Sequence, residues 1–257
     1  MVDLGLKGKK AVVFGVADEN SVAWHIVKAL NEEEVRVAIA YQERAEDSVL
    51  ALVSSLKNSI MVKCDVTDDS LLDNFFKKVK KEFGTIDFLI HSVAFAKKDF
   101  LKGKFFEVDR KGYKTSQEVS AYSLVEITRR AYPLLNKEGS IIAMTYMGST
   151  RVFSNYNVMG VCKAALEASV RYLANDVGDK GIRVNAISFS PIRTRAASGI
   201  SGFEEHLKEH KKIAPLKRNI HQEDVANLAL FLCSDLSKNI TGQTIFVDAG
   251  YGIMGSY

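Results

Sequence analysis

The chain has 257 residues, of which 47% are hydrophobic and 26% are charged, proportions that suit a folded protein with a sizeable core. Its formal net charge is only +4, and no stripe of alternating basic and aromatic residues is present, which argues against a nucleic-acid partner. The N-terminal residues lack the apolar core of a signal peptide, and no apolar run reaches the length of a membrane span. We therefore expect a cytoplasmic protein without a membrane partner. The three cysteines and five histidines have no metal-ligand spacing, and we predict no metal site.

Short apolar runs alternate with helical patterns along the chain. Predicted strands lie at 11–16, 35–41, 60–64, 86–91, 140–145, 183–188 and 244–247, with helical patterns between them that include 21–30, 70–83 and 221–233. Continuous apolar strands separated by helices indicate a parallel sheet that is covered on both faces. Since no repeat or linker interrupts this pattern, we predict that 1–257 is a single α/β Rossmann-type domain. Its core would be a doubly wound parallel sheet of about seven strands.

Distinctive residues follow five of the predicted strands. They are Gly15 after the first strand, Asp65 and Val66 after the third, His91 and Ser92 after the fourth, Tyr146 after the fifth and Pro191 after the sixth. In a doubly wound sheet, ligands bind beyond the carboxyl ends of the strands, and these ends meet at one edge. The sequence therefore predicts a binding site at that edge.

The turn after the first strand is a candidate pyrophosphate site. It lacks the G-x-G-x-x-G pattern, because Gly15 is the only glycine between Gly8 and Gly84. Gly15 would still permit a tight turn, and Asn20 and Ser21 would begin the next helix, whose free amides could bind the pyrophosphate. A capped helix without a ligand explains this stretch about equally well.

The ends of the second and third strands are candidate contacts for adenosine. Gln42 and Glu43 suit free ribose hydroxyls, whereas Arg44 keeps a 2′-phosphate possible. Asp65 could meet the adenine amino group, or it could simply cap the helix that follows.

Tyr156 and Lys163 are separated by almost two turns of a predicted helix and so share one face. A phenol can donate a hydrogen bond to an oxygen that gains negative charge, and a nearby ammonium can hold a hydroxylated cofactor. Taken alone, this pair would be explained by an ordinary amphipathic helix.

In this order the motifs resemble those of the enoyl-[acyl-carrier-protein] reductases, a divergent branch of the short-chain dehydrogenase/reductase superfamily. The most specific stretches are 123–124, 155–160, 183–188, 191–194 and 231–236, together with the Gly-x5-Ser spacing at 15–21. Ordinary carbonyl-reducing members have a serine and a lysine where this chain has Ala143 and Gly160. The longer spacing from Tyr156 to Lys163 and the additional Tyr146 are typical of the enoyl reductases.

The resemblance implies an oxidoreductase of fatty acid elongation that reduces the trans-2 double bond of enoyl thioesters on an acyl carrier protein. It also implies a homotetramer and NAD as the cofactor, with NADH preferred and NADPH not excluded. Tyr156 would bind the developing oxyanion, Lys163 would hold the nicotinamide ribose, and Tyr146 would shape the entrance or assist proton delivery. Cofactor contacts are then expected at Gly15, Ser21, Val22, Gln42, Asp65, Val66, Ser92, Val93, Lys163, Ile192 and Thr194. Acyl-chain contacts are expected at Ala94, Phe95, Ala96, Tyr146, Met159, Ala196, Ile200 and Phe203.

Three departures from the family pattern bear on substrate fit. His25 stands where glycine is usual, Phe189 and Ser190 replace an Ala-Gly pair, and Arg195 replaces an apolar residue.

Two other functions stay open at this point. One is an ordinary short-chain carbonyl or alcohol dehydrogenase, and the other is a non-catalytic, dinucleotide-sensing regulator.

We also expect a mobile substrate-binding loop around 194–212, because glycines and serines follow Thr194. Basic residues at Lys208, Lys211 and Lys212 lie towards its C-terminal end and could attract an acidic carrier protein.

Overall fold

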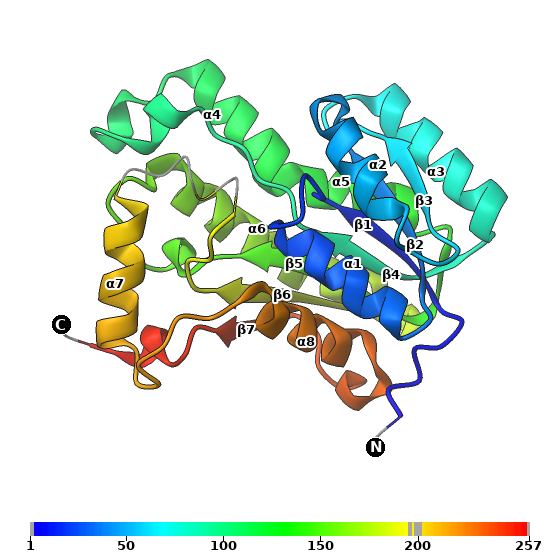
Figure 1. Ribbon diagram of the computed structural model, residues 1–257. Coiled ribbons are helices and arrows are strands. Elements are labelled where there is room, and N and C mark those ends of the chain that lie inside the picture. Colours follow the sequence, from blue (N-terminus) through cyan, green and yellow to red (C-terminus); the bar gives the residue numbers. More distant parts are fainter. Residues whose placement is uncertain (1–2, 195–196, 198–201, 256–257) are drawn as a thin grey trace.

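Within the residues that the computed structural model describes (3–194, 197 and 202–255), seven strands form one parallel sheet (Figure 1). The strands are β1 (Lys10–Phe14), β2 (Arg36–Tyr41), β3 (Ile60–Lys63), β4 (Ile86–His91), β5 (Leu135–Thr145), β6 (Arg183–Phe189) and β7 (Thr244–Val247). Their order across the sheet is β3-β2-β1-β4-β5-β6-β7. The predicted doubly wound sheet is confirmed.

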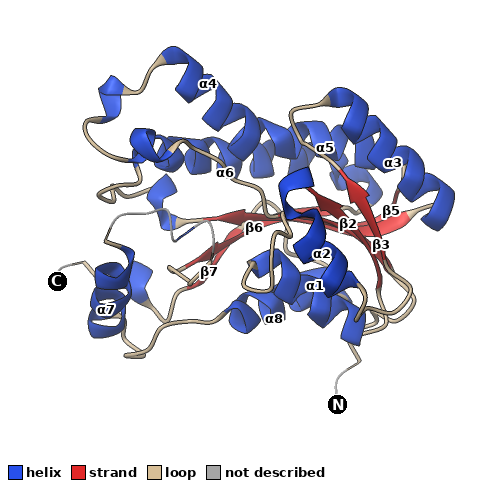
Figure 2. Cartoon of the chain, turned by 45° about the horizontal axis from the view of Figure 1, so that its top comes forward, coloured by secondary structure: helices blue, strands red, loops and turns tan. Residues whose placement is uncertain are grey.

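Helices cover both faces of this sheet (Figure 2). They are α1 (Val22–Glu32), α2 (Glu46–Val53), α3 (Asp69–Phe83), α4 (Arg110–Gln117), α5 (Ser123–Ala131), α6 (Asn157–Val177), α7 (Phe203–Ile213) and α8 (Gln222–Cys233). One apolar core lies between the sheet and α1, α2 and α8, and a second lies between the sheet and α3, α5 and α6. In the described part of the chain, no helix is both long and apolar enough to cross a membrane.

Local sequence explains where these elements begin and end. Every residue of β4 is buried, as expected for an apolar strand with a helix layer on each side. Helix α3 begins where the Asp68 carboxylate accepts hydrogen bonds from the amides of Ser70 and Leu71, and it ends at Gly84, whose φ is +75°. These are the usual cap residues, since a short acidic side chain satisfies free amides and glycine tolerates a positive φ.

The strand order reverses between β1 and β4, and this reversal positions the site. The Ser92 amide donates to the Phe14 carbonyl at 3.1 Å, so the loops that follow the two strands diverge from a common point. A crevice at such a switch point is the usual ligand site of an open α/β sheet.

The predicted loop around 194–212 differs from the structure in its second half, where Phe203–Ile213 form α7. Leu207 and His210, three residues apart, are buried on the inner face of this helix. The sequence-based prediction assigned both residues to the loop. Residues 195–196 and 198–201 lie outside the described part, and so do the predicted acyl contacts Ala196 and Ile200.

Candidate active site

A cavity of about 620 Å³ opens at the carboxyl edge of the sheet. The predicted site residues that line it are Gly15, Ser21, Val22, Gln42, Val66, Ser92, Val93, Ala94, Phe95, Ala96, Tyr146, Tyr156, Met159, Lys163, Ile192, Thr194 and Phe203. The structure thus brings together residues from the loops that follow β1 to β6 and from α1, α6 and α7, as the strand-end argument predicts.

The turn after β1 leaves the start of α1 open to the cavity. The φ of Gly15 is +104°, and a Cβ atom there would lie 2.0 Å from the Ser92 carbonyl oxygen, so only glycine fits. The Ser21 hydroxyl donates back to the Asp18 carbonyl at 2.6 Å, and no side chain caps α1. Unpaired amides at a helix start attract anions, so this end of α1 suits a pyrophosphate.

The adenosine end of the cavity differs in part from the sequence prediction. Gln42 and Arg44 line it, whereas the Glu43 carboxylate lies 2.7 Å from the Lys63 ammonium in an exposed ion pair. Asp65 is not among the lining residues, and its carboxylate instead accepts from the Thr67 amide and hydroxyl at 2.9 and 2.8 Å. Asp65 does not cap α3 either, since the cap is Asp68; its carboxylate instead closes the turn before that helix.

Tyr146 and Tyr156 meet above the end of β5. Their ring centroids are 4.9 Å apart in an edge-to-face arrangement, and Tyr146 also packs on Phe153 at 5.1 Å. Burial raises the pKa of Tyr156 well above that of a free phenol, with the neighbouring Tyr146 as a smaller cause. Tyr156 therefore keeps its proton at neutral pH and can donate a hydrogen bond.

Close packing of α6 on the turn Met147–Ser149 explains why the lysine follows at 163. A Cβ atom at Gly160 would lie 2.7 Å from the Gly148 carbonyl oxygen, and one at Gly148 would lie 2.6 Å from the Tyr156 ring. A lysine at 160, the position used by ordinary carbonyl-reducing relatives, would require this backbone to move. Ala143, where those enzymes have a serine, is fully buried in the core.

Lys163 is a buried cation beside the two tyrosines, with 5% of its surface exposed. Its Nζ donates to the Met144 carbonyl at 2.8 Å, while the carboxylate of Glu167, one turn along α6, accepts from the Thr145 hydroxyl at 2.7 Å. Burial lowers the pKa of Lys163 to about 8. The ammonium is thus partly desolvated and retains capacity to donate to a ligand in the cavity.

His91, which also follows a strand, belongs to the core and is not among the cavity residues. The Ser123 hydroxyl donates to the Val119 carbonyl at 2.7 Å, so at 2.8 Å its oxygen accepts from His91 Nε2. Burial lowers the pKa of His91 to about 3, with the nearby Lys163 as a further cause, and the ring is neutral.

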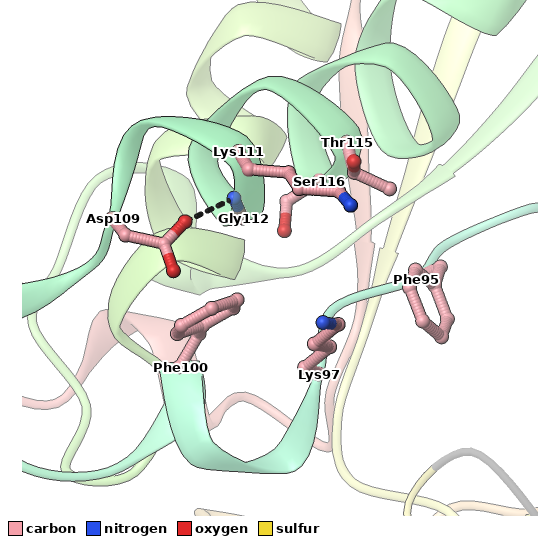
Figure 3. Close-up of a pocket in the computed structure, with 8 residues that line it drawn as sticks. All are labelled: Phe95, Lys97, Phe100, Asp109, Lys111, Gly112, Thr115 and Ser116. Atoms are coloured by element: carbon pink, nitrogen blue, oxygen red, sulfur yellow. Dashed lines mark hydrogen bonds between the residues drawn. The ribbon is translucent and has the colours of Figure 1, made fainter.

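A smaller pocket lies beside the cavity and shares one wall with it (Figure 3). The Phe100 ring packs so closely on α4 that a Cβ atom at Gly112 would lie 2.0 Å from it, and the Asp109 carboxylate accepts from the Gly112 amide at 2.7 Å. Lys97 and Phe95 line both hollows, so this contact anchors the segment that forms the cavity wall.

Sequence reasoning missed several cavity residues, among them Leu101, Val119, Phe153 and His206. Each is an ordinary apolar or aromatic residue, or a surface-type histidine, in its local context. No short-range pattern distinguishes them, because only the packing of distant segments brings them to the cavity.

The residues and their geometry define a short-chain dehydrogenase/reductase fold with a tyrosine–lysine site of the enoyl reductase type. The chain matches the family described as "Enoyl-(Acyl carrier protein) reductase" over residues 15–252 and belongs to that family.

Proteins of known function are similar to this chain in sequence over nearly its whole length. Enoyl-[acyl-carrier-protein] reductase [NADH] FabI of Bacillus cereus is 46% identical over 253 residues, which cover 97% of this chain and 99% of the relative. The protein of the same name from Rickettsia typhi is 45% identical over 98% of this chain and 97% of its own. A crystal structure of the Bacillus cereus reductase with NADP+ and an indole naphthyridinone superimposes with a TM-score of 0.96, at 46% identity and covering 99% of this chain and all of that one. The Anaplasma phagocytophilum reductase in complex with NAD has a TM-score of 0.93 at 43% identity, and the match covers 100% of this chain and 96% of that one.

The Gly15 contact gives a first prediction. Gly15→Ala should weaken cofactor binding by more than about tenfold, because the new methyl group must displace the Ser92 carbonyl and with it the cavity wall. Fluorescence titration with NADH measures the dissociation constant. Gly8→Ala is the matched control, since Gly8 also has a positive φ of +77° but has nothing within 4 Å of the added atom. Equal effects of the two substitutions would show that backbone strain alone is responsible.

The lowered pKa of Lys163 gives a second prediction. Because the ammonium loses its proton as pH rises through about 8, and a bound ribose would favour the charged form, cofactor affinity should fall through that range. The fall is at most about tenfold per pH unit. Lys163→Met should bind more weakly and without this pH dependence, whereas Lys77→Met, on the exposed side of α3, should keep it. A native affinity that stays constant through pH 8 would contradict the assignment.

Proposed function

We propose that this protein reduces the trans-2 double bond of enoyl thioesters carried on an acyl carrier protein, with NADH as reductant, in fatty acid elongation. The observation that carries the proposal is the paired Tyr156 and buried Lys163 at an apolar cavity, in a chain of the enoyl reductase family.

The cavity fits a nicotinamide dinucleotide, which when bound supplies the hydride for the β-carbon of the substrate. The open start of α1 would hold the pyrophosphate, Gln42 the adenosine ribose and Lys163 the nicotinamide ribose. Ile192 and Thr194, after β6, would contact the nicotinamide end.

Tyr156 supplies electrostatic stabilisation. As the double bond accepts hydride, negative charge moves to the thioester oxygen, and the Tyr156 hydroxyl donates a hydrogen bond to it. Its raised pKa keeps it a donor throughout the reaction. Lys163 adds positive potential, and Tyr146, packed edge-to-face against Tyr156, limits the room in which the thioester can turn.

The far part of the cavity is apolar and suits an acyl chain. Phe95, Leu101, Met159 and Phe203 line it, and an alkyl chain gains mainly from area removed from water.

The two other functions fit less well. An ordinary carbonyl dehydrogenase would need catalytic groups at 143 and 160, where a buried alanine and a tightly packed glycine stand. A non-catalytic sensor would not need the ammonium of Lys163 buried beside Tyr156, an arrangement that costs free energy of folding.

We also infer a homotetramer in the cytoplasm. Large apolar side chains stay exposed on single chains, including Tyr122, Tyr172, Phe246 and Ile253, and contact with further copies would cover them. The free, buried cysteines Cys64, Cys162 and Cys233 suit a reducing compartment. A sedimentation mass equal to one 28.5-kDa chain would overturn the tetramer.

The proposed reaction predicts a loss of NADH absorbance when trans-2-dodecenoyl thioester is added. Tyr156→Phe removes the oxyanion donor while keeping the ring contact with Tyr146, and should lower kcat by about 100-fold or more with little change in cofactor affinity. Phe153→Leu serves as a control for the aromatic cluster, because it disturbs the packing but removes no donor. Full activity of Tyr156→Phe would exclude this role.

Cofactor choice follows from the adenosine end. We predict a higher kcat/KM with NADH than with NADPH, because a 2′-phosphate would be placed beside neutral Gln42 and close to anionic Glu43. Arg44 lines the cavity as well, so Arg44→Ala should reduce kcat/KM for NADPH more than for NADH. A native preference for NADPH would mean that the arginine dominates, which the Glu43–Lys63 pair would favour.

Docking of the acidic carrier is predicted on α7. Lys208, Lys211 and Lys212 are exposed, while Glu204 is held by Arg193 at 2.7 Å and repels less than its sequence position suggests. Reversal of the three lysines to glutamate should raise KM for the carrier-bound substrate several-fold and spare the coenzyme A thioester, since rim charges act mainly on association.

Three exposed lysines on α3, Lys77, Lys80 and Lys81, allow a matched charge reversal far from the cavity. Loss of activity with both substrates, or an equal effect of the control triple, would reduce the α7 cluster to an ordinary solvated surface.

A further inference from the structure

A buried polar contact joins α7 to the loop that follows β6. His210, in the last turn of α7, and Ser190, directly after β6, are each 2% exposed, and His210 Nε2 lies 2.6 Å from the Ser190 hydroxyl oxygen. Ser190 is one of the positions where this chain departs from the family pattern. Either tautomer of the ring keeps one hydrogen bond here, because the hydroxyl can donate to a bare nitrogen or accept from a protonated one.

The His210 ring is fixed on its other sides as well. Nε2 lies 3.1 Å from the Asp248 carbonyl, Nδ1 lies 3.1 Å from Asn219 Oδ1, and the ring stacks on Tyr251 with centroids 4.9 Å apart. These partners come from the segments after α7 and after β7. Figures 1 and 2 show α7 standing beside the C-terminal segment, away from the helix layers that cover the sheet. Leu207 is also buried on this helix, and His210 supplies the polar part of its attachment.

Both ends of this contact reach the cavity. Ser190 lines it next to Pro191 and Ile192, while α7 contributes Phe203 and His206. His206 is one helical turn before His210 and so lies on the same face of α7. The contact thus connects the wall expected to meet the nicotinamide with the helix expected to cover the acyl chain.

A second link between the same two segments is much weaker. Arg193 and Glu204 pair at 2.7 Å, but their side chains are 71% and 55% exposed, and exposed ion pairs contribute little. A buried polar group that loses its partner is more costly, so the interior contact dominates.

We propose that His210 is a positioning residue that, through Ser190, holds α7 against the cavity and so sets the affinity for the acyl chain. This inference rests on the proposed function. When the contact is broken, α7 should spend less time in the position that completes the acyl wall, and the apparent affinity falls by that fraction. Hydride transfer should be affected less, because Tyr156 and Lys163 belong to α6 and the neighbouring turn.

The test compares Ser190→Ala, His210→Leu and the double variant with the native protein. We expect each single variant to raise KM for trans-2-dodecenoyl thioester by roughly three- to tenfold. In His210→Leu, whose side chain is not among the cavity residues, kcat and the NADH dissociation constant should stay nearly unchanged. The KM of the double variant should be no higher than that of the more affected single variant, since both substitutions remove the same contact. Hydrogen exchange of the α7 amides, 203–213, should rise in all three.

Ser140→Ala is the matched control. It also removes a fully buried serine hydroxyl, which donates to the Leu232 carbonyl at 2.8 Å, but Ser140 is not among the cavity residues. It should lower stability without changing KM or α7 exchange.

Unchanged KM and unchanged α7 exchange in Ser190→Ala would overturn the inference, as would additive effects in the double variant. If the native protein fails to oxidise NADH with an enoyl thioester, the proposed function fails instead. The exchange of α7 in Ser190→Ala, measured without substrate, then still decides whether His210 holds the helix.

Discussion

The close approach of α6 to the turn Met147–Ser149 is the constraint on which the site depends. Because a Cβ atom at Gly160 would meet the Gly148 carbonyl at 2.7 Å, the helix can lie this close only where both positions are glycine. The approach places the Tyr156 ring against Tyr146 and leaves no room for a lysine at 160. The cation therefore comes from the next inward-facing position that reaches the cavity, Lys163. Backbone packing thus accounts for the absence of a lysine at 160, where ordinary carbonyl-reducing members of the superfamily have theirs.

That packing also determines the electrostatics. Lys163 is carried into the protein interior, where it has one carbonyl partner and where burial brings its pKa to about 8. A buried ammonium costs free energy, and an enzyme retains one where its charge is needed. The buried Glu167 carboxylate favours the charged form of Lys163, and the neutral His91 ring adds no repulsion. The Tyr156 phenol, whose pKa moves upward, and the Lys163 ammonium, whose pKa moves downward, are both kept in useful protonation states near neutral pH.

The sequence predicts the strands, their parallel arrangement and most of the cavity, because these depend on local apolar runs and on residues directly after strands. Prediction from sequence is less successful where contacts between distant segments determine the position of a side chain. Asp65 has the position of an adenine contact but turns to the Thr67 amide, and Glu43 is drawn to Lys63 on the adjacent strand β3. The sequence predicts a loop where α7 forms, because glycines and serines precede this stretch, and the buried face of the helix becomes evident only beside β6 and the C-terminal segment. The pairing of Ser190 with His210, twenty residues apart, has no signal in either local sequence.

Two of the three departures from the family pattern, at 25 and at 189–190, have partners in the described part of the structure, whereas Arg195 lies outside it. His25, which replaces a glycine, lies 3.1 Å from both the Glu19 carbonyl and the Glu223 carboxylate, and so ties the pyrophosphate turn to α8. Ser190 is bonded to His210, and the adjacent Phe189 packs partly on the core between the sheet and α1. Each of these larger side chains thus contacts residues other than Tyr156 and Lys163. The geometry around Tyr156 depends instead on Gly148 and Gly160, where an added Cβ atom would meet the Tyr156 ring or the Gly148 carbonyl.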